Sequence, residues 1–71
     1  MGIRLTSEEG KTALYDSVSG FAFGPVFDTE VEAAEFADYA ESRLNKALNK
    51  MLHREIDEVY ATWLMSMEGS R

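Results

Sequence analysis

The sequence contains a single histidine, His53, and no cysteine. Imidazole is the side chain that titrates closest to neutral pH, so His53 is the first candidate for a general base. Asp57 lies four residues further on, one helical turn away, where its carboxylate can orient the ring or share a metal ion with it. One histidine and one carboxylate supply only two of the three or four ligands that zinc requires. We therefore expect no catalytic residue, no metal and no cofactor, and we place His53 at a helix end or in an interface.

Carboxylates form the second candidate group. Asp and Glu outnumber Lys and Arg by 13 to 7, which gives a net charge of −6, and a dense acidic run ends only at Arg43. Around a helix axis these side chains are widely spread, which disfavours an acid–base pair. Two interpretations stay open: an ordinary solvated helix face, or a surface that binds a basic partner. The candidate partner-binding residues are Asp28, Glu32, Glu35, Asp38 and Glu41.

Four cations form the third group: Arg43, Lys46, Lys50 and Arg54. On one continuous helix their spacing confines them to an arc of roughly 80°. Such a stripe can bind phosphate, pair with the acidic segment of a neighbouring subunit, or simply be solvated. Because the chain is strongly acidic overall, we rank self-association above nucleic-acid binding. A dimeric nucleic-acid-binding regulator that uses this stripe remains the alternative function.

The elements that must position these groups begin with three short strands, at residues 2–6, 11–16 and 21–27, separated by polar loops. In the third strand, Phe21, Phe23 and Phe27 share one face, whereas Ala22 and Val26 share the other. Pro25 lacks an N–H and belongs on an edge strand or at a bulge. Because one sheet face is left without cover, Phe21 and Phe23 are candidates for an aromatic surface.

A helix is predicted to begin at Thr29, because Thr29 and Glu32 form a capping box. From there to Met67 no glycine or proline intervenes, but the apolar residues form two stripes about 130° apart. We favour two helices with a break near residues 49–53, and one long helix is the alternative. The second stripe is the predicted surface for self-association. Its candidate residues are Leu52, Ile56, Val59, Tyr60, Trp63 and Met67.

These elements predict an α+β protein of one domain over residues 1–71, with a three-stranded antiparallel meander at 1–27 and helical structure at 29–68. A chain of 71 residues has a small core, and without cysteine it has no disulfide to reinforce it. We therefore expect a homodimer or larger assembly. No stretch is long and apolar enough for a membrane span, and no signal peptide is recognisable. These features favour a cytoplasmic protein that does not act at membranes.

The segment from Asp16 to Thr29, followed by Ala33-Ala34-Glu35-Phe36, resembles a pattern in short bacterial and phage-encoded proteins of unassigned function. These proteins carry an aromatic-Gly-Pro-Val-Phe turn that leads into a Glu/Ala-rich helix. The resemblance covers under a third of the chain. It implies no catalytic residue, but small accessory proteins of this kind often act by binding and blocking another protein.

Together these observations predict a small, acidic, non-enzymatic protein-interaction module. In its sharpest form, the hypothesis is an inhibitor that binds the basic, nucleic-acid-binding surface of a larger protein, as a phage anti-defence factor would.

Overall fold

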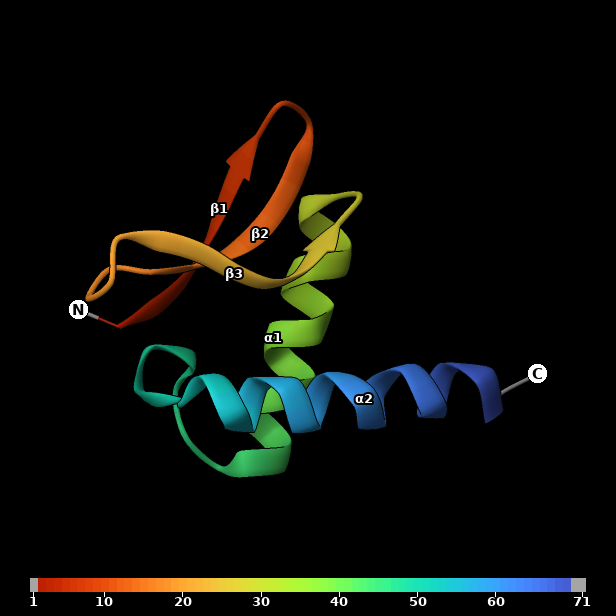
Figure 1. Cartoon of the computed structure of the whole chain (residues 1–71). Helices are drawn as coiled ribbons and strands as arrows, with labels where there is room; N and C mark the ends of the chain where they lie inside the picture. The colour runs from red at the N-terminus through yellow and green to blue at the C-terminus, as the bar shows by residue number, and fades with distance from the viewer. Residues whose placement is uncertain (1, 70–71) are drawn as a thin grey trace.

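The computed structural model describes residues 2–69 and shows an antiparallel sheet of three strands followed by two helices, which confirms the predicted α+β fold (Figure 1). Strand order follows the chain, β1-β2-β3. The elements are β1 (Ile3–Glu8), β2 (Lys11–Asp16), β3 (Phe21–Phe27), α1 (Glu30–Leu44), the 3₁₀ turn η1 (Leu48–Lys50) and α2 (His53–Gly69). Among residues 2–69, no helix combines the length and apolar content needed to cross a bilayer.

The hairpin between β1 and β2 is tighter than the sequence suggested. Glu9 and Gly10 alone form the loop, with φ values of 52° and 80°, and two positive φ angles match the twist of the flanking strands. As a result, β1 continues to Glu8, which pairs with Lys11.

Strand β3 contains a bulge at Gly24 and Pro25. Ala13 pairs with Val26 and the next residue, Leu14, pairs with Phe23, so two residues of β3 have no partner in β2. Gly24 supplies the positive φ of 69°, and Pro25 needs no ladder hydrogen bond there. Because the bulge inserts two residues, the side-chain alternation is preserved. All three phenylalanines of β3 therefore lie on the face that also carries Leu14.

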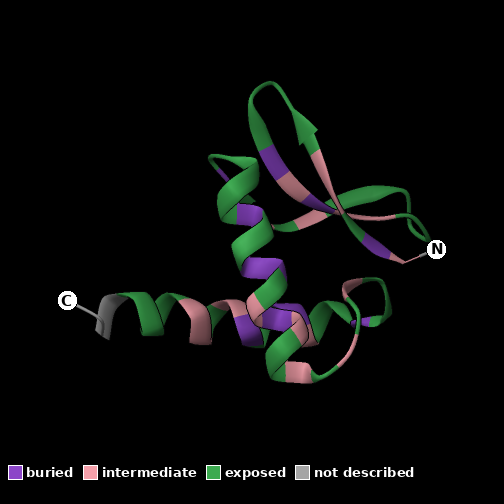
Figure 2. Ribbon diagram, turned by 180° about the vertical axis from the view of Figure 1, so that it is seen from behind, coloured by how far each residue is buried: buried purple, intermediate pink, exposed green. Residues whose placement is uncertain are grey.

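The core lies between this sheet face and the two helices. Phe36 of α1 and Leu14 of β2 are fully buried. Phe36 contacts Phe27, Tyr60 and Trp63, with ring centroids 5.3–5.6 Å from its own. Helix α2 crosses α1, and its last turns extend beyond the rest of the chain (Figures 1 and 2). The remaining buried apolar residues are Ile3, Phe27, Ala33, Ala37, Ala40, Met51, Ile56 and Val59.

The helix boundaries are partly as predicted. The Glu32 amide donates to the Thr29 hydroxyl over 3.1 Å, as the capping box requires, although the Glu32 carboxylate makes no return bond to the Thr29 amide among the described residues. The break lies earlier than expected. Helix α1 ends at Leu44, and Asn45 adopts the left-handed conformation with φ 55°, which asparagine tolerates better than most residues.

After α1, the chain turns back to the sheet through η1, which packs beside the start of β1. Gly2 has a φ of +115°, and a β-carbon at this position would collide with the carbonyl oxygen of Asn49. The glycine therefore permits a close backbone approach that holds η1 against the sheet.

We expect Gly2→Ala to lower the free energy of unfolding by about 2 kcal/mol more than Gly20→Ala. Both substitutions place a side chain at a positive φ, but a β-carbon at Gly20 meets nothing within 4 Å. Urea unfolding of the two variants measures the difference. Equal losses would show that η1 does not depend on the contact at Gly2.

Candidate functional site

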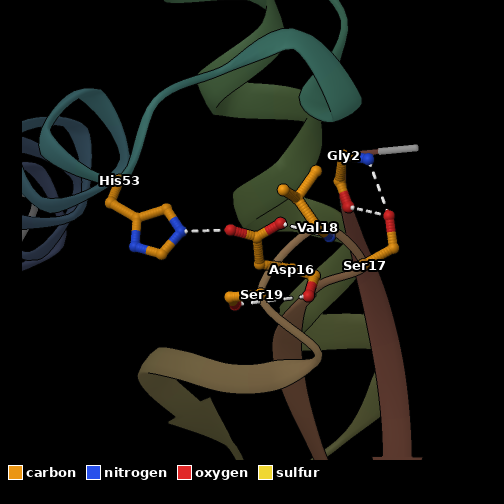
Figure 3. A network of polar contacts seen from close by, with 6 residues as sticks. All are labelled: Gly2, Asp16, Ser17, Val18, Ser19 and His53. Atoms are coloured by element: carbon orange, nitrogen blue, oxygen red, sulfur yellow. Dashed lines mark hydrogen bonds and ion pairs between the residues drawn. The ribbon is translucent and has the colours of Figure 1, made fainter.

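His53 binds an aspartate that the sequence did not suggest. Its Nε2 lies 2.7 Å from Oδ2 of Asp16, at the end of β2 (Figure 3). The carboxylate that contacts His53 comes from a residue 37 positions away, and the possible pairing with Asp57 is not the one observed. Since an ionised carboxylate can only accept hydrogen bonds, Nε2 carries the hydrogen in this contact. His53 itself is the first residue of α2, which is the helix end where we expected it.

The turn after β2 fixes the Asp16 carboxylate. The Oδ1 atom of Asp16 accepts a hydrogen bond from the Val18 amide over 2.9 Å, and the backbone carbonyl of Asp16 accepts one from the Gly20 amide over 2.8 Å. The hydroxyl of the next residue, Ser17, accepts a hydrogen bond from the Gly2 amide and donates one to the Gly2 carbonyl (Figure 3). The hydrogen bonds from His53 and Val18, in this order, hold the pKa of Asp16 below its ordinary value.

Phe23 completes the surroundings of His53. The two rings stack with centroids 3.8 Å apart and planes within 2° of parallel. Phe23 is thus half-buried and not part of an open aromatic surface, whereas Phe21 is 73% exposed. Of the two residues predicted for the aromatic surface, only Phe21 is accessible.

The arrangement around His53 joins α2 to the sheet. Within residues 2–69, no hydroxyl is hydrogen-bonded to the ring, and no group of three or more His, Asp or Glu side chains is placed to hold a metal. Asp16 and Phe23 instead attach the first residue of α2 to the sheet. Such a contact can fix the direction in which α2 leaves the sheet.

Of the five acidic candidates, two bind groups of the same chain and three form no ion pair within the described residues. Asp28 binds the Lys11 ammonium at 2.8 Å, and this hydrogen bond lowers the pKa of Asp28. Glu41 is half-buried and accepts from the Leu48 amide over 2.9 Å, so it supports the turn into η1. The other three are exposed and make no ion pair within the described chain. We call them the α1 acidic face: Glu32, Glu35 and Asp38.

The four cations do not form the predicted helical stripe. Because α1 ends at Leu44, Arg43 lies on α1, Lys46 in the connection, Lys50 on η1 and Arg54 on α2. Lys46 donates to both carboxylate oxygens of Glu55 over 2.9 Å, and Glu55 also accepts from the Leu52 amide. These bonds lower the pKa of Glu55. The Arg43 guanidinium lies 6.0 Å from the centre of the Tyr39 ring.

The predicted self-association stripe on α2 is largely used within the chain. Ile56 and Val59 are buried in the core, and Tyr60 and Trp63 are half-buried against Phe27 and Phe36. Leu52 and Met67 remain exposed. The part of the stripe that a second chain could reach is therefore much smaller than the six residues suggest, and self-association through it stays a prediction.

Sequence reasoning missed Asp16 as a functional neighbour, although one local signal marks it. Aspartate followed by Ser-Val-Ser-Gly is typical of a turn in which the carboxylate accepts a nearby amide. That signal identifies the turn but not the histidine, because the contact depends on where α2 begins.

No protein-family model, no curated protein and no solved structure matches this chain.

The contact between Asp16 and His53 makes stability depend on pH in a defined direction. Because the pKa of folded Asp16 is lowered, its stabilisation is present above the pKa of an unfolded aspartate, about 3.9, and is lost as the pH falls through the folded value. We expect Asp16→Asn to melt at a lower temperature than the wild type at neutral pH, and the difference to shrink below about pH 4. Glu35→Gln, at an exposed carboxylate without a partner, is the control. A difference that is independent of pH would contradict the assignment.

Proposed function

We propose that this protein is a non-enzymatic interaction module that binds a basic protein surface through the α1 acidic face. The observation that carries the proposal is that Glu32, Glu35 and Asp38 are exposed at regular spacing and are not neutralised by an ion pair within residues 2–69. Three residues of helix correspond to a rise of about 4.5 Å and a turn of about 60°, so the three carboxylates form a row that winds through about 120° around the helix axis.

The helix that carries this row is firmly attached to the core. Phe36 and Ala40 are buried on its inner side, and the Thr29 cap fixes its first turn. A partner therefore meets carboxylates whose backbone is already ordered, which lowers the entropy cost of binding. Val31 is 68% exposed in the first turn of α1 and can add an apolar contact beside the charges.

The distribution of cations also supports the proposal. Lys11 and Lys46 form their ion pairs with Asp28 and Glu55, and Lys11 attracts Glu32 of the α1 acidic face only over a longer distance. Arg43, the cation in the last turn of α1, lies over Tyr39. With a net charge of −6, the protein is attracted to basic surfaces over long range.

The partner chemistry that fits a row of carboxylates is a surface rich in Lys and Arg. Surfaces of this kind commonly bind nucleic-acid phosphates, so a protein that occupies one acts as a competitive inhibitor of nucleic-acid binding. We place the nucleic-acid regulator second, because its four cations do not share one helical face.

The test is a pulldown with the immobilised protein from a lysate of cells that encode it, at low and at moderate salt. We expect a retained protein with a basic surface, weaker retention at higher salt, and release by added duplex DNA. Glu35→Lys/Asp38→Lys should reduce retention by at least about tenfold, because each reversal replaces attraction by repulsion.

The matched control is Asp57→Lys/Glu58→Lys, which changes the net charge equally on exposed residues of α2. It should retain the partner more strongly than the α1 variant. If both variants lose the same amount of retained partner, the effect comes from overall charge and not from the α1 acidic face. Retention that changes neither with salt nor in either variant would refute the proposal.

A further inference from the structure

We propose that the free edge of β1 pairs with the same edge of a second copy, so that two chains form one continuous antiparallel sheet. This inference is independent of the proposed function, because it uses none of the residues of the α1 acidic face. It rests on three observations: which backbone groups β1 leaves unpaired, which charges lie along it, and what surrounds it.

The direction of the backbone groups follows from the hairpin. A two-residue loop is flanked by a hydrogen-bonded pair, here Glu8 and Lys11, and such pairs then alternate along the ladder. The amides and carbonyls of residues 4, 6 and 8 therefore point toward β2. At the start of the strand, Gly2 follows the same alternation, since its carbonyl accepts from the Ser17 amide over 2.9 Å.

The odd residues of β1 consequently direct their backbone groups away from the sheet. Within residues 2–69, no hydrogen bond satisfies the outward amides and carbonyls of Leu5 and Ser7. Figure 2 shows the end of β1 at the outside of the sheet, with no other segment beside it. An exposed strand edge of this kind is a template for pairing with another strand.

The opposite edge of the sheet is less suited to pairing. The bulge interrupts β3, and Pro25 offers no amide. The edge of β1 contains neither proline nor bulge. The start of β1 packs beside η1, and Arg4 lines a pocket together with Asn49, so the pairing is centred on Thr6, in the middle of the strand.

Charge selects both the occupant and the register. When two copies of β1 pair antiparallel about a two-fold axis at Thr6, Arg4 of each chain faces Glu8 of the other. Leu5 and Ser7 then form the hydrogen-bonded pairs, and Thr6 faces its own copy. This register agrees with the alternation of the backbone groups. It also places opposite charges and Thr–Thr in the closely spaced positions where cross-strand side chains interact most.

Both charges are available for this contact. Glu8 lies opposite Lys11 in the hairpin, but the Lys11 ammonium binds Asp28 instead. Glu8 has no ion pair within the described chain. Arg4 is exposed and lies over Tyr15, with 5.1 Å between its guanidinium carbon and the ring centre, and a carboxylate can bind the outer side of the guanidinium while the ring covers its inner side.

The core-facing side of the edge also benefits from a neighbour. A cavity of about 310 Å³ opens between β1 and α1, lined by Leu5, Ser7, Thr12, Glu30 and Ala34. Leu5 is only half-buried there. In the paired sheet, the two Leu5 side chains approach diagonally across the axis, which removes apolar surface from water.

The experiment measures solution mass by sedimentation equilibrium from micromolar to millimolar protein. We expect a reversible dimer of the 8.0 kDa chain. Arg4→Glu and Glu8→Arg should each weaken dimerisation by at least about tenfold, since each replaces two symmetric attractions by repulsions. The double variant Arg4→Glu/Glu8→Arg should restore it, because the charges are then exchanged between the strands. Circular dichroism checks that each variant is folded.

Thr6→Lys is an independent variant, because it places two ammonium groups face to face at the axis. Its control is Ala22→Lys, on the same sheet face but on β3, which should leave the dimer intact. A chain that is monomeric at every concentration would overturn the proposal. So would a dimer that withstands Thr6→Lys, or one that is lost only with Met65→Lys at the exposed end of α2.

Discussion

The burial of Phe36 is the contact on which the rest of the structure depends. Its ring is fully buried and packs with Phe27 of β3 and with Tyr60 and Trp63 of α2 in one cluster, in which all pairs of ring centroids are 5.3–6.1 Å apart. In this cluster a side chain of α1 packs against both the sheet and the second helix. In a chain of 71 residues, a shared aromatic core of this kind replaces the disulfides or metal that small domains often use. It also leaves the opposite side of α1 free to carry charge.

The sequence predicted the elements well because their signals are local. Alternation, the polar loops and the Thr29 cap are each contained in a few residues. Strands β2 and β3 and the start of α1 lie where these signals place them, and β1 differs in running on to Glu8. Pro25 was expected at an edge or a bulge, and it lies at both. Asn45 was missed, because asparagine ends a helix only where it adopts the left-handed conformation, and its identity alone does not require that.

The contacts of the candidate site could not be predicted in the same way, because they join residues that are far apart in the chain. His53 meets Asp16, Lys46 meets Glu55, and Lys11 meets Asp28. The first two contacts depend on where α1 stops and how η1 returns the chain to the sheet, whereas the third follows from the pairing of β2 with β3, in which Thr12 lies opposite Phe27. The cationic stripe required one continuous helix, and it is absent because α1 ends at Leu44. The use of the α2 stripe could not be predicted for a related reason. An apolar stripe indicates that a helix surface is covered, but it does not indicate whether the same chain or another one covers it.

The bulge in β3 also limits how many chains a sheet like this can join. A sheet whose two edge strands are both open can pair with a further chain on each side. Identical chains would then add to one another without end and form a fibre. Here Gly24 and Pro25 interrupt the outer edge of β3, which leaves β1 as the uninterrupted edge. In the proposed dimer, association at this single self-complementary edge stops after one partner, because the bulge leaves β3 without a comparable edge.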